Sequence, residues 1–174
     1  MKKYIILLRG INVSGKHKIP MAELRELLHN LKFKNVETYI QSGNIILDSE
    51  YSKEVICQKI EEGITNKYGY NIPALARTLE EWKNAIARYP FSLENEKIVA
   101  FSFLNEESKI TDIEVKGIKD DKYEVDGDVV YLNCISGFGK TKLTNNNIEK
   151  KLNVVATTRN YKTTIKLLEL ATKE

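Results

Sequence analysis

Residues 36–47 read Val-Glu-Thr-Tyr-Ile-Gln-Ser-Gly-Asn-Ile-Ile-Leu, and this stretch decides the fold. Its first part alternates Val, Thr and Ile with Glu, Tyr and Gln, a pattern that is typical of a β-strand. Ser42-Gly43-Asn44 predicts a tight turn, because Gly and Asn accept positive φ angles. Apolar residues then return, so the stretch predicts a β-hairpin.

The segments on either side of this hairpin predict helices and further strands. The expected elements are a strand at 4–8, a helix from 21 to 31, strands at 36–40 and 45–47, a helix at 56–68, a strand at 72–77 and a helix from 79. Gly69 is expected to end one helix, and Thr78-x-x-Glu81 is a capping box that opens the next. This βαββαβ order is the split βαβ pattern of ferredoxin-like folds.

The same order is expected again in the second half of the chain. Asp126-Gly127 predicts a hairpin 84 residues after Gly43, and Arg159 ends a strand 82 residues after Arg77. The expected elements are a strand at 98–104, a weaker helix marked by Ile110 and Ile113, strands at 123–125 and 129–135, a helix around 148–152, a strand at 154–158 and a last helix capped by Asn160. The near-constant offset predicts two copies of one unit.

We therefore expect an α+β fold of two ferredoxin-like (alpha-beta plait) subdomains in tandem, residues 1–90 and 91–174, each βαββαβ plus a trailing helix. With 174 residues, of which 42% are hydrophobic, the composition excludes a disordered chain. Two distant cysteines without a CxxC motif favour a cytoplasmic environment. We expect no membrane span, because no apolar run approaches roughly 18 residues, and no metal site, because no Cys/His cluster is present.

Charge is distributed unevenly along the chain. The formal net charge is only +3, but residues 1–20 hold five Lys/Arg and no acidic residue, and residues 140–174 hold eight basic and three acidic residues. Both ends are basic and the middle is acidic. A basic surface favours anionic partners.

The predicted topology gathers polar, Gly-bearing loops at the edges of the sheets. In a split βαβ unit the loop after strand one and the hairpin emerge at the same end, which in the first repeat joins Arg9–Lys18 to Ser42–Asn44. Strands three and four end at the opposite edge, which in the second repeat joins Gly137–Lys140 to Thr158–Asn160. We expect a ligand site among these segments.

Two arginines stand at strand ends in these segments. The chain has 5 Arg against 22 Lys, and the planar guanidinium of Arg9 or Arg159 would grip a carboxylate or phosphate with two hydrogen bonds. The helix expected after Arg159 offers free N–H groups that also favour anions. A structural ion pair is the alternative role for each arginine.

Residues 10–17, Gly-Ile-Asn-Val-Ser-Gly-Lys-His, approach the GxxxxGK pattern of phosphate-binding loops. His17 stands where that motif needs Ser or Thr, and the expected helix begins only at Pro20 instead of directly after the loop. A nucleoside triphosphatase loop is therefore not predicted. Backbone N–H groups of this loop, with Lys16 and Lys18, would still hold an anion. A flexible basic loop is the alternative.

One bacterial family, numbered 1697 among the domains of unknown function, resembles this chain in three ordered motifs. These motifs are Leu8-Arg9-Gly10-Ile11-Asn12-Val13 with Gly15 and Ile19-Pro20-Met21, then Thr38-Tyr39-Ile40-Gln41-Ser42-Gly43-Asn44, and last Thr158-Arg159-Asn160-Tyr161-Lys162-Thr163. The resemblance implies two alpha-beta-plait subdomains and no particular activity. The chain departs from the family pattern at Ser14, His17 and Tyr161, where Gly, Asn and Trp are usual.

These observations predict a cytoplasmic protein that binds an anionic ligand, a nucleotide or a phosphorylated metabolite. The predicted ligand-binding residues are Arg9, Gly10, Asn12, Gly15, Lys16, Ser42, Gly43, Asn44, Arg159 and Asn160. No cofactor or catalytic residue is identified and turnover is left open, although Ser42 or His17 would serve as nucleophile or base. The alternatives are an RNA-binding module and a structural or oligomeric protein whose motif residues join the repeats.

Overall fold

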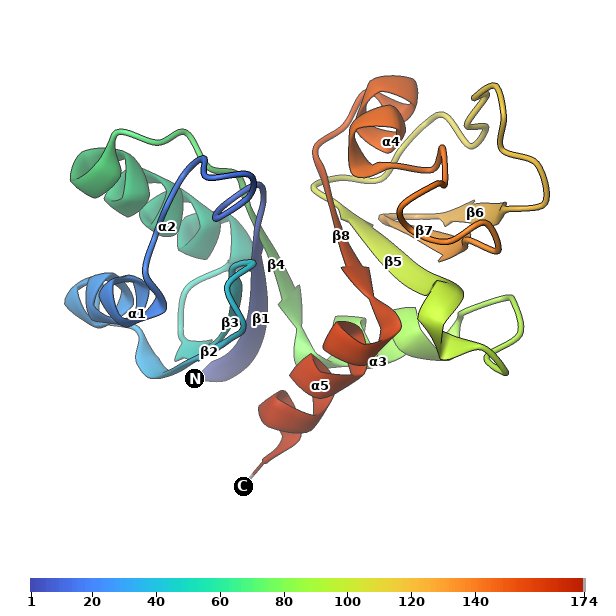
Figure 1. Cartoon of the computed structure of the whole chain (residues 1–174). Coiled ribbons are helices and arrows are strands. Elements are labelled where there is room, and N and C mark those ends of the chain that lie inside the picture. The colour runs from blue at the N-terminus through green and yellow to red at the C-terminus, as the bar shows by residue number, and fades with distance from the viewer. Residues whose placement is uncertain (174) are drawn as a thin grey trace. The chain divides into compact units, whose positions relative to one another are not determined.

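The computed structural model describes residues 1–173, which divide into two compact units. The first unit contains residues 1–84 and the end of the last helix from Leu167, and the second contains residues 85–166. The protein is a mixed α+β fold with one four-stranded antiparallel sheet and accompanying helices in each unit (Figure 1). The boundary expected between residues 90 and 91 stays a prediction. Among the described residues, no helix has both the length and the apolarity needed to cross a membrane.

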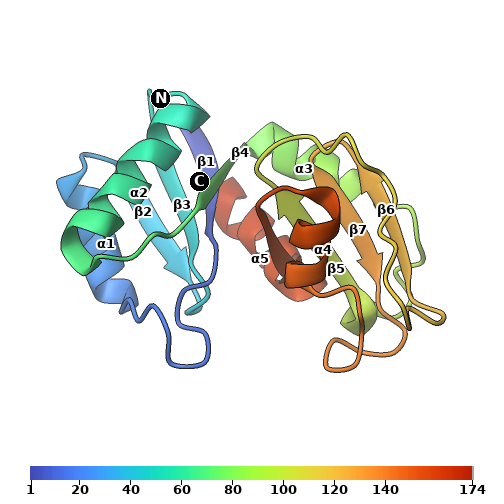
Figure 2. The same cartoon turned by 90° about the horizontal axis from the view of Figure 1, so that it is seen from above.

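The first unit follows the expected order of elements. It contains β1 (Lys2–Leu8), α1 (Met21–Asn30), β2 (Lys34–Tyr39), β3 (Asn44–Ser49), α2 (Lys53–Tyr68) and β4 (Ala74–Thr78), and the chain then enters α3 (Leu79–Ala87). The strands lie in the order β2-β3-β1-β4, and every neighbouring pair is antiparallel. Helices α1 and α2 pack on one face of this sheet, against alternate apolar residues of β1 and β3 (Figure 2).

Local capping signals fix the helix ends of the first unit. Gly69 ends α2 in the left-handed conformation with φ of 73°, as the sequence predicts. The capping box is also confirmed, because Thr78 N–H donates to Glu81 Oε2 over 2.8 Å and Glu81 N–H donates to Thr78 Oγ1 over 3.1 Å. The first cap ends α2 before β4, and the second directs the chain from β4 into α3.

The second unit keeps the strand order of the first but has fewer helices on its sheet. A short 3-10 helix, η1 (Glu96–Ile98), leads into β5 (Val99–Leu104), β6 (Lys122–Asp126), β7 (Val129–Asn133), α4 (Asn145–Leu152), β8 (Ala156–Asn160) and α5 (Tyr161–Thr172). The strands lie in the order β6-β7-β5-β8, again antiparallel throughout. Ile148 and Leu152 of α4 pack on Ala100 of β5 and Leu132 of β7.

The helix expected around Ile110 and Ile113 is wrong, because residues 105–121 form an irregular loop. Ile113 is buried in the core but Ile110 is 45% exposed, so the two side chains do not share a buried helical stripe. Gly117 and Lys119 have positive φ angles of 83° and 57°, which interrupt a right-handed helix. The second unit therefore lacks the first helix of the βαββαβ order.

The two units repeat the same backbone hydrogen bonds at the ends of their first strands. Leu8 N–H donates to Gly43 O over 2.8 Å, and Leu104 N–H donates to Asp128 O over 2.8 Å. The next residue then reaches the start of the fourth strand, through Arg9 N–H to Pro73 O at 3.0 Å and through Asn105 N–H to Val155 O at 2.9 Å. The structural counterpart of Arg9 is therefore Asn105.

The start of the fourth strand is held in the same way in both units. The Glu61 carboxylate of α2 accepts Ala74 N–H over 2.8 Å, and the Glu149 carboxylate of α4 accepts Ala156 N–H over 2.9 Å. Three residues after each alanine stands an arginine, Arg77 opposite Ile5 and Arg159 opposite Phe101. The offset of 82 residues between these arginines in the sequence is therefore an offset between equivalent positions.

Candidate functional site

Asn12 joins the loop after β1 to the β2–β3 hairpin in the first unit. Its Nδ2 donates to Ile19 O over 3.0 Å and to Gln41 O over 2.8 Å, and its Oδ1 accepts Ile19 N–H over 2.8 Å. The expected meeting of this loop and this hairpin is therefore observed. We call residues 9–20 and 40–44 together the first-unit edge.

The loop of the first-unit edge folds into a small hairpin of its own. Lys16 N–H donates to Val13 O over 2.9 Å, and the two residues between them, Ser14 and Gly15, have φ angles of 50° and 72°. These are the signs of a type I′ turn. His17 also has a positive φ of 49°, and its Nδ1 lies 3.0 Å from Gly10 O. The left-handed conformations at Ser14 and His17 explain why the family pattern has Gly and Asn there.

Packing within the hairpin accounts for Ser42, Gly43 and Asn44. The fully buried Asn44 side chain donates through Nδ2 to Tyr39 O over 3.0 Å and to Ser42 Oγ over 2.9 Å. A Cβ atom on Gly43, whose φ is 84°, would lie 2.6 Å from Leu8 Cβ, so only glycine fits. These residues stabilise the first-unit edge, and their part in ligand binding stays a prediction.

The basic residues of the first-unit edge differ in exposure. Arg9 is half-buried, with its N–H group bonded to Pro73 O over 3.0 Å, whereas Lys16 and Lys18 are exposed. The Gly10 and Gly15 positions both have positive φ angles and would leave a Cβ atom in open space. Ligand contacts by Arg9, Gly10, Gly15 and Lys16 also stay predictions.

In the second unit, the two segments expected to share an edge line one pocket with a volume of about 340 Å³. We call it the helix-start pocket, and its lining residues are Ala100, Leu132, Phe138, Thr141, Leu143, Thr144, Asn145, Thr158 and Asn160. Thr144 caps α4 by accepting Asn147 N–H over 3.2 Å, and Asn160 caps α5 by accepting Thr163 N–H over 2.9 Å. Two helices therefore begin at the wall of one pocket, and the predicted cap at Asn160 is confirmed.

Side-chain hydrogen bonds hold the polar wall of the helix-start pocket in place. Asn145 Nδ2 donates to Ala156 O over 2.8 Å, and the Thr158 hydroxyl donates to Asn145 Oδ1 over 3.0 Å. Thr158 Oγ1 also lies 3.1 Å from Ser102 Oγ. The first residue of α4 is thereby fixed to β8, so the start of α4 is rigidly placed beside the sheet.

The Asp121 carboxylate anchors residues 136–141, the loop that lines part of the helix-start pocket. Its buried carboxylate accepts Ser136 N–H over 2.8 Å and the Thr141 hydroxyl over 2.7 Å, and it also accepts the Ser136 hydroxyl. Burial acts to raise the pKa of Asp121, but the hydrogen bonds from Ser136 and Thr141 outweigh it, so the pKa lies below its usual value. Both ends of residues 136–141 are therefore tied to one buried charge.

Phe138 stands between these two anchored ends and was not singled out by the sequence. It lines the helix-start pocket, is 44% exposed, and lies between Gly137, whose φ is 85°, and Gly139. The Gly-Phe-Gly-Lys sequence reads as an ordinary strand-to-helix turn. A large aromatic residue between two glycines of an expected turn is the sequence signal that could have marked it.

Arg159 does not line the helix-start pocket, although its neighbours on both sides do. Side chains alternate along a strand, so Thr158 and Asn160 face α4 whereas Arg159 faces the other side, opposite Phe101. There its Nη1 donates to Thr157 Oγ1 over 2.6 Å and to Thr158 O over 3.1 Å. Burial lowers the pKa of Arg159 to about 10. Arg159 and Asn160 are the two ligand-binding residues predicted in the second unit, and of these only Asn160 lines this pocket.

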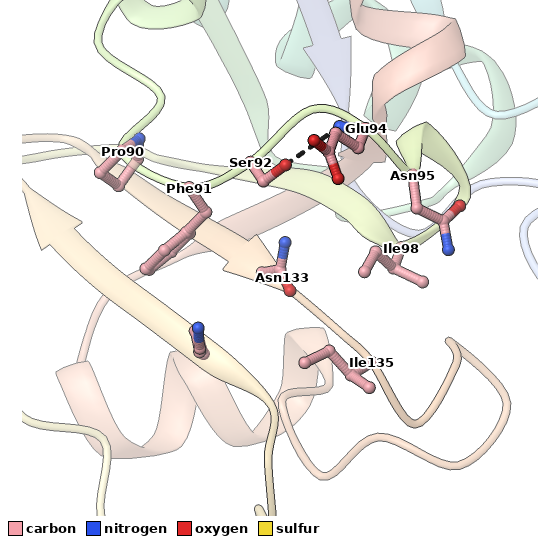
Figure 3. A pocket seen from close by; sticks show the side chains of 9 residues that line it. Pro90, Phe91, Ser92, Glu94, Asn95, Ile98, Asn133 and Ile135 are labelled. Atoms are coloured by element: carbon pink, nitrogen blue, oxygen red, sulfur yellow. Dashed lines mark hydrogen bonds between the residues drawn. The ribbon is translucent and has the colours of Figure 1, made fainter.

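A second pocket of the same unit, about 470 Å³, lies beside the segment between α3 and β5 (Figure 3). Its lining residues are Pro90, Phe91, Ser92, Glu94, Asn95, Ile98, Lys122, Asn133 and Ile135. Most of these side chains are exposed, and Asn133 is buried with its Nδ2 donating to Tyr89 Oη over 3.4 Å. The sequence analysis predicts no pocket at this segment.

Comparisons with known proteins place the chain in a family. A search of curated proteins finds no significant match. A solved structure that is similar to the chain is described as a conserved bacterial protein from Streptococcus pneumoniae, with 28% sequence identity, 99% coverage of both chains and a TM-score of 0.77. The family model described as "Protein of unknown function (DUF1697)" matches residues 1–131, which contain the first two of the three motifs. The chain therefore belongs to the DUF1697 family, as the resemblance of its motifs predicts.

Proposed function

We propose that this protein binds an anionic small molecule, a nucleotide or a phosphorylated metabolite, in the helix-start pocket. The observation that carries the proposal is the convergence of two capped helix starts, at Thr144 and Asn160, on one pocket. The positive dipole end of each helix attracts anions. The pocket volume of about 340 Å³ lies within the range of small-molecule sites.

The surroundings of the pocket support an anion over a cation. Its lining residues are uncharged, and three exposed lysines lie within two residues of them in the chain. These are Lys140, Lys142 and Lys162. The basic segment 140–174 therefore contains both of the helix starts at the pocket.

We also propose the first-unit edge as a separate anion site within the first unit. Its support is the presence of Arg9, Lys16 and Lys18 on a loop that Asn12 ties to the hairpin. We also propose that the first unit is ferredoxin-like, which its β2-β3-β1-β4 order supports, and that the second is the same fold without its first helix. A cytoplasmic location stays our prediction.

The observations favour this proposal over an RNA-binding module. RNA-recognition sheets stack bases on exposed aromatic side chains of their central strands. The aromatic residues of β5 and β7, Phe101, Phe103 and Tyr131, are at most 1% exposed. Tyr89 packs against Phe101 and Tyr131, with ring centroids 5.5 and 5.8 Å away.

The test is a calorimetric titration with inorganic phosphate and with nucleoside monophosphates. Asn160→Asp and Thr144→Asp place a negative charge at the pocket but keep a good helix cap, so the fold is preserved. Each should weaken binding by at least about tenfold through like-charge repulsion. Ser52→Asp makes the same change at the cap of α2, outside the pocket, and should leave binding unchanged. Equal affinities in all four proteins would refute the site.

A further inference from the structure

The most exposed apolar side chain of the helix-start pocket belongs to Phe138. The other apolar lining residues, Ala100, Leu132 and Leu143, are at most 2% exposed, whereas Phe138 is 44% exposed. An exposed phenyl ring at the mouth of a pocket offers a planar apolar face to a ligand. Packing in the core of the second unit therefore does not explain why residue 138 is aromatic.

The turn that carries Phe138 is held firmly. Gly137 N–H donates to Cys134 O over 2.9 Å, and Lys140 N–H and Thr141 N–H both donate to Gly137 O, over 3.1 and 2.9 Å. The Asp121 carboxylate fixes Ser136 and Thr141 on either side. An aromatic ring on such a turn is placed before a ligand arrives, which lowers the entropic cost of stacking.

Open space and polar side chains are both present in the pocket that the ring lines. A Cβ atom on either Gly137 or Gly139 would find no heavy atom within 4 Å, so the turn is open on both sides of Phe138. The same pocket is lined by Asn145 and Thr158, whose side chains are bonded to each other, and by Asn160, whose Oδ1 caps α5 and whose Nδ2 is a donor. Amides and hydroxyls are the groups that read the polar edge of a nucleobase.

We propose that the anionic ligand of the helix-start pocket is a nucleoside phosphate whose base stacks on Phe138. This inference rests on the proposed function, because it adds a base to the phosphate that the starts of α4 and α5 attract. A sugar phosphate without a base would leave the Phe138 ring in water. Base stacking on an aromatic side chain typically strengthens binding by about tenfold or more.

The experiment titrates the intact protein with the four ribonucleoside monophosphates, ribose 5-phosphate and inorganic phosphate. The best nucleotide should bind at least about tenfold more tightly than ribose 5-phosphate. Phe138→Ala should remove that difference without changing the affinity for ribose 5-phosphate or phosphate. Phe138→Tyr should keep it, and Phe138→Leu should lose it, because leucine restores apolar area without a planar ring. Leu93→Ala, which removes another exposed apolar side chain of this unit, should change none of the affinities.

The possible outcomes distinguish a failure of this inference from a failure of the proposed anion site. If nucleotides, ribose 5-phosphate and inorganic phosphate bind with equal affinity, the inference of a nucleoside phosphate ligand is wrong and the anion site stands. No binding of any ligand would overturn both. A spectroscopic check uses Phe138→Trp in a Trp82→Phe background, where nucleotides should quench the indole fluorescence and ribose 5-phosphate should not. Equal quenching by both ligands would contradict stacking.

Discussion

Replacing Asp121 tests the clamp that positions the pocket loop. Asp121→Ala removes the acceptor of three hydrogen bonds, from Ser136 N–H, the Ser136 hydroxyl and the Thr141 hydroxyl. Each hydrogen bond to a buried charged group contributes about 1.5–3 kcal/mol, and the two hydroxyls can partly turn to other acceptors. We therefore expect the free energy of unfolding to fall by about 3–5 kcal/mol.

Asp121→Asn is the matched variant. Its amide oxygen still accepts Ser136 N–H, and both hydroxyls can rotate to accept from the new NH₂ group, so the loss should be only about 1–2 kcal/mol. Urea denaturation at pH 7 measures both values. Equal losses for the two variants, or a loss below about 1 kcal/mol for Asp121→Ala, would refute the clamp.

The same clamp predicts a pH dependence. The pKa of Asp121 is lowered in the folded protein, so its ionised form stabilises the fold at neutral pH. That stabilisation is complete above the unfolded pKa of about 3.9 and is lost as the pH falls toward the lower folded pKa. The difference in unfolding free energy between the native protein and Asp121→Asn should shrink below about pH 4, and an increase there would contradict the assignment.

Three further predictions concern residues outside the helix-start pocket. Gly43→Ala should destabilise the protein by about 2–4 kcal/mol in urea denaturation, because its Cβ atom would meet Leu8 Cβ at 2.6 Å. Ser14→Gly should raise the unfolding free energy by about 0.5 kcal/mol, since φ is 50° there, and a decrease would argue against the turn. Burial raises the pKa of the Cys57 thiol to about 11, so iodoacetamide at pH 8 should modify it far more slowly in the folded than in the urea-unfolded chain, as mass spectrometry would measure.

Much of the fold could be predicted because its signals are local. Gly69, the Thr78–Glu81 pair and Asn160 each fix a helix end through their own conformation or a bond to the next turn. The helix expected at Ile110 and Ile113 failed because two apolar residues three apart do not define a buried stripe. Their burial depends on which surface of the second unit the chain crosses, and Ile113 alone reaches its core.

The candidate site was predicted less completely, for a related reason. The topology correctly brought the 137–140 loop and the end of β8 to one pocket. Side chains alternate along a strand, so Arg159 and Asn160 face opposite sides of the sheet. Arg159, the predicted anion-binding side chain of this unit, therefore faces away from the pocket. Phe138 was missed because exposure of a ring depends on the packing around its turn, which residue type does not encode.

The most direct test of the account is an amide chemical-shift titration of the ¹⁵N-labelled protein with a nucleoside monophosphate. We predict that the largest shifts will fall on the first-turn amides of α4 and α5 and on residues 137–141, because these groups surround the helix-start pocket. Asn160→Asp should move the midpoint of those shifts to a ligand concentration at least about tenfold higher. Shifts that are absent, or that fall elsewhere and survive Asn160→Asp, would contradict the central claim.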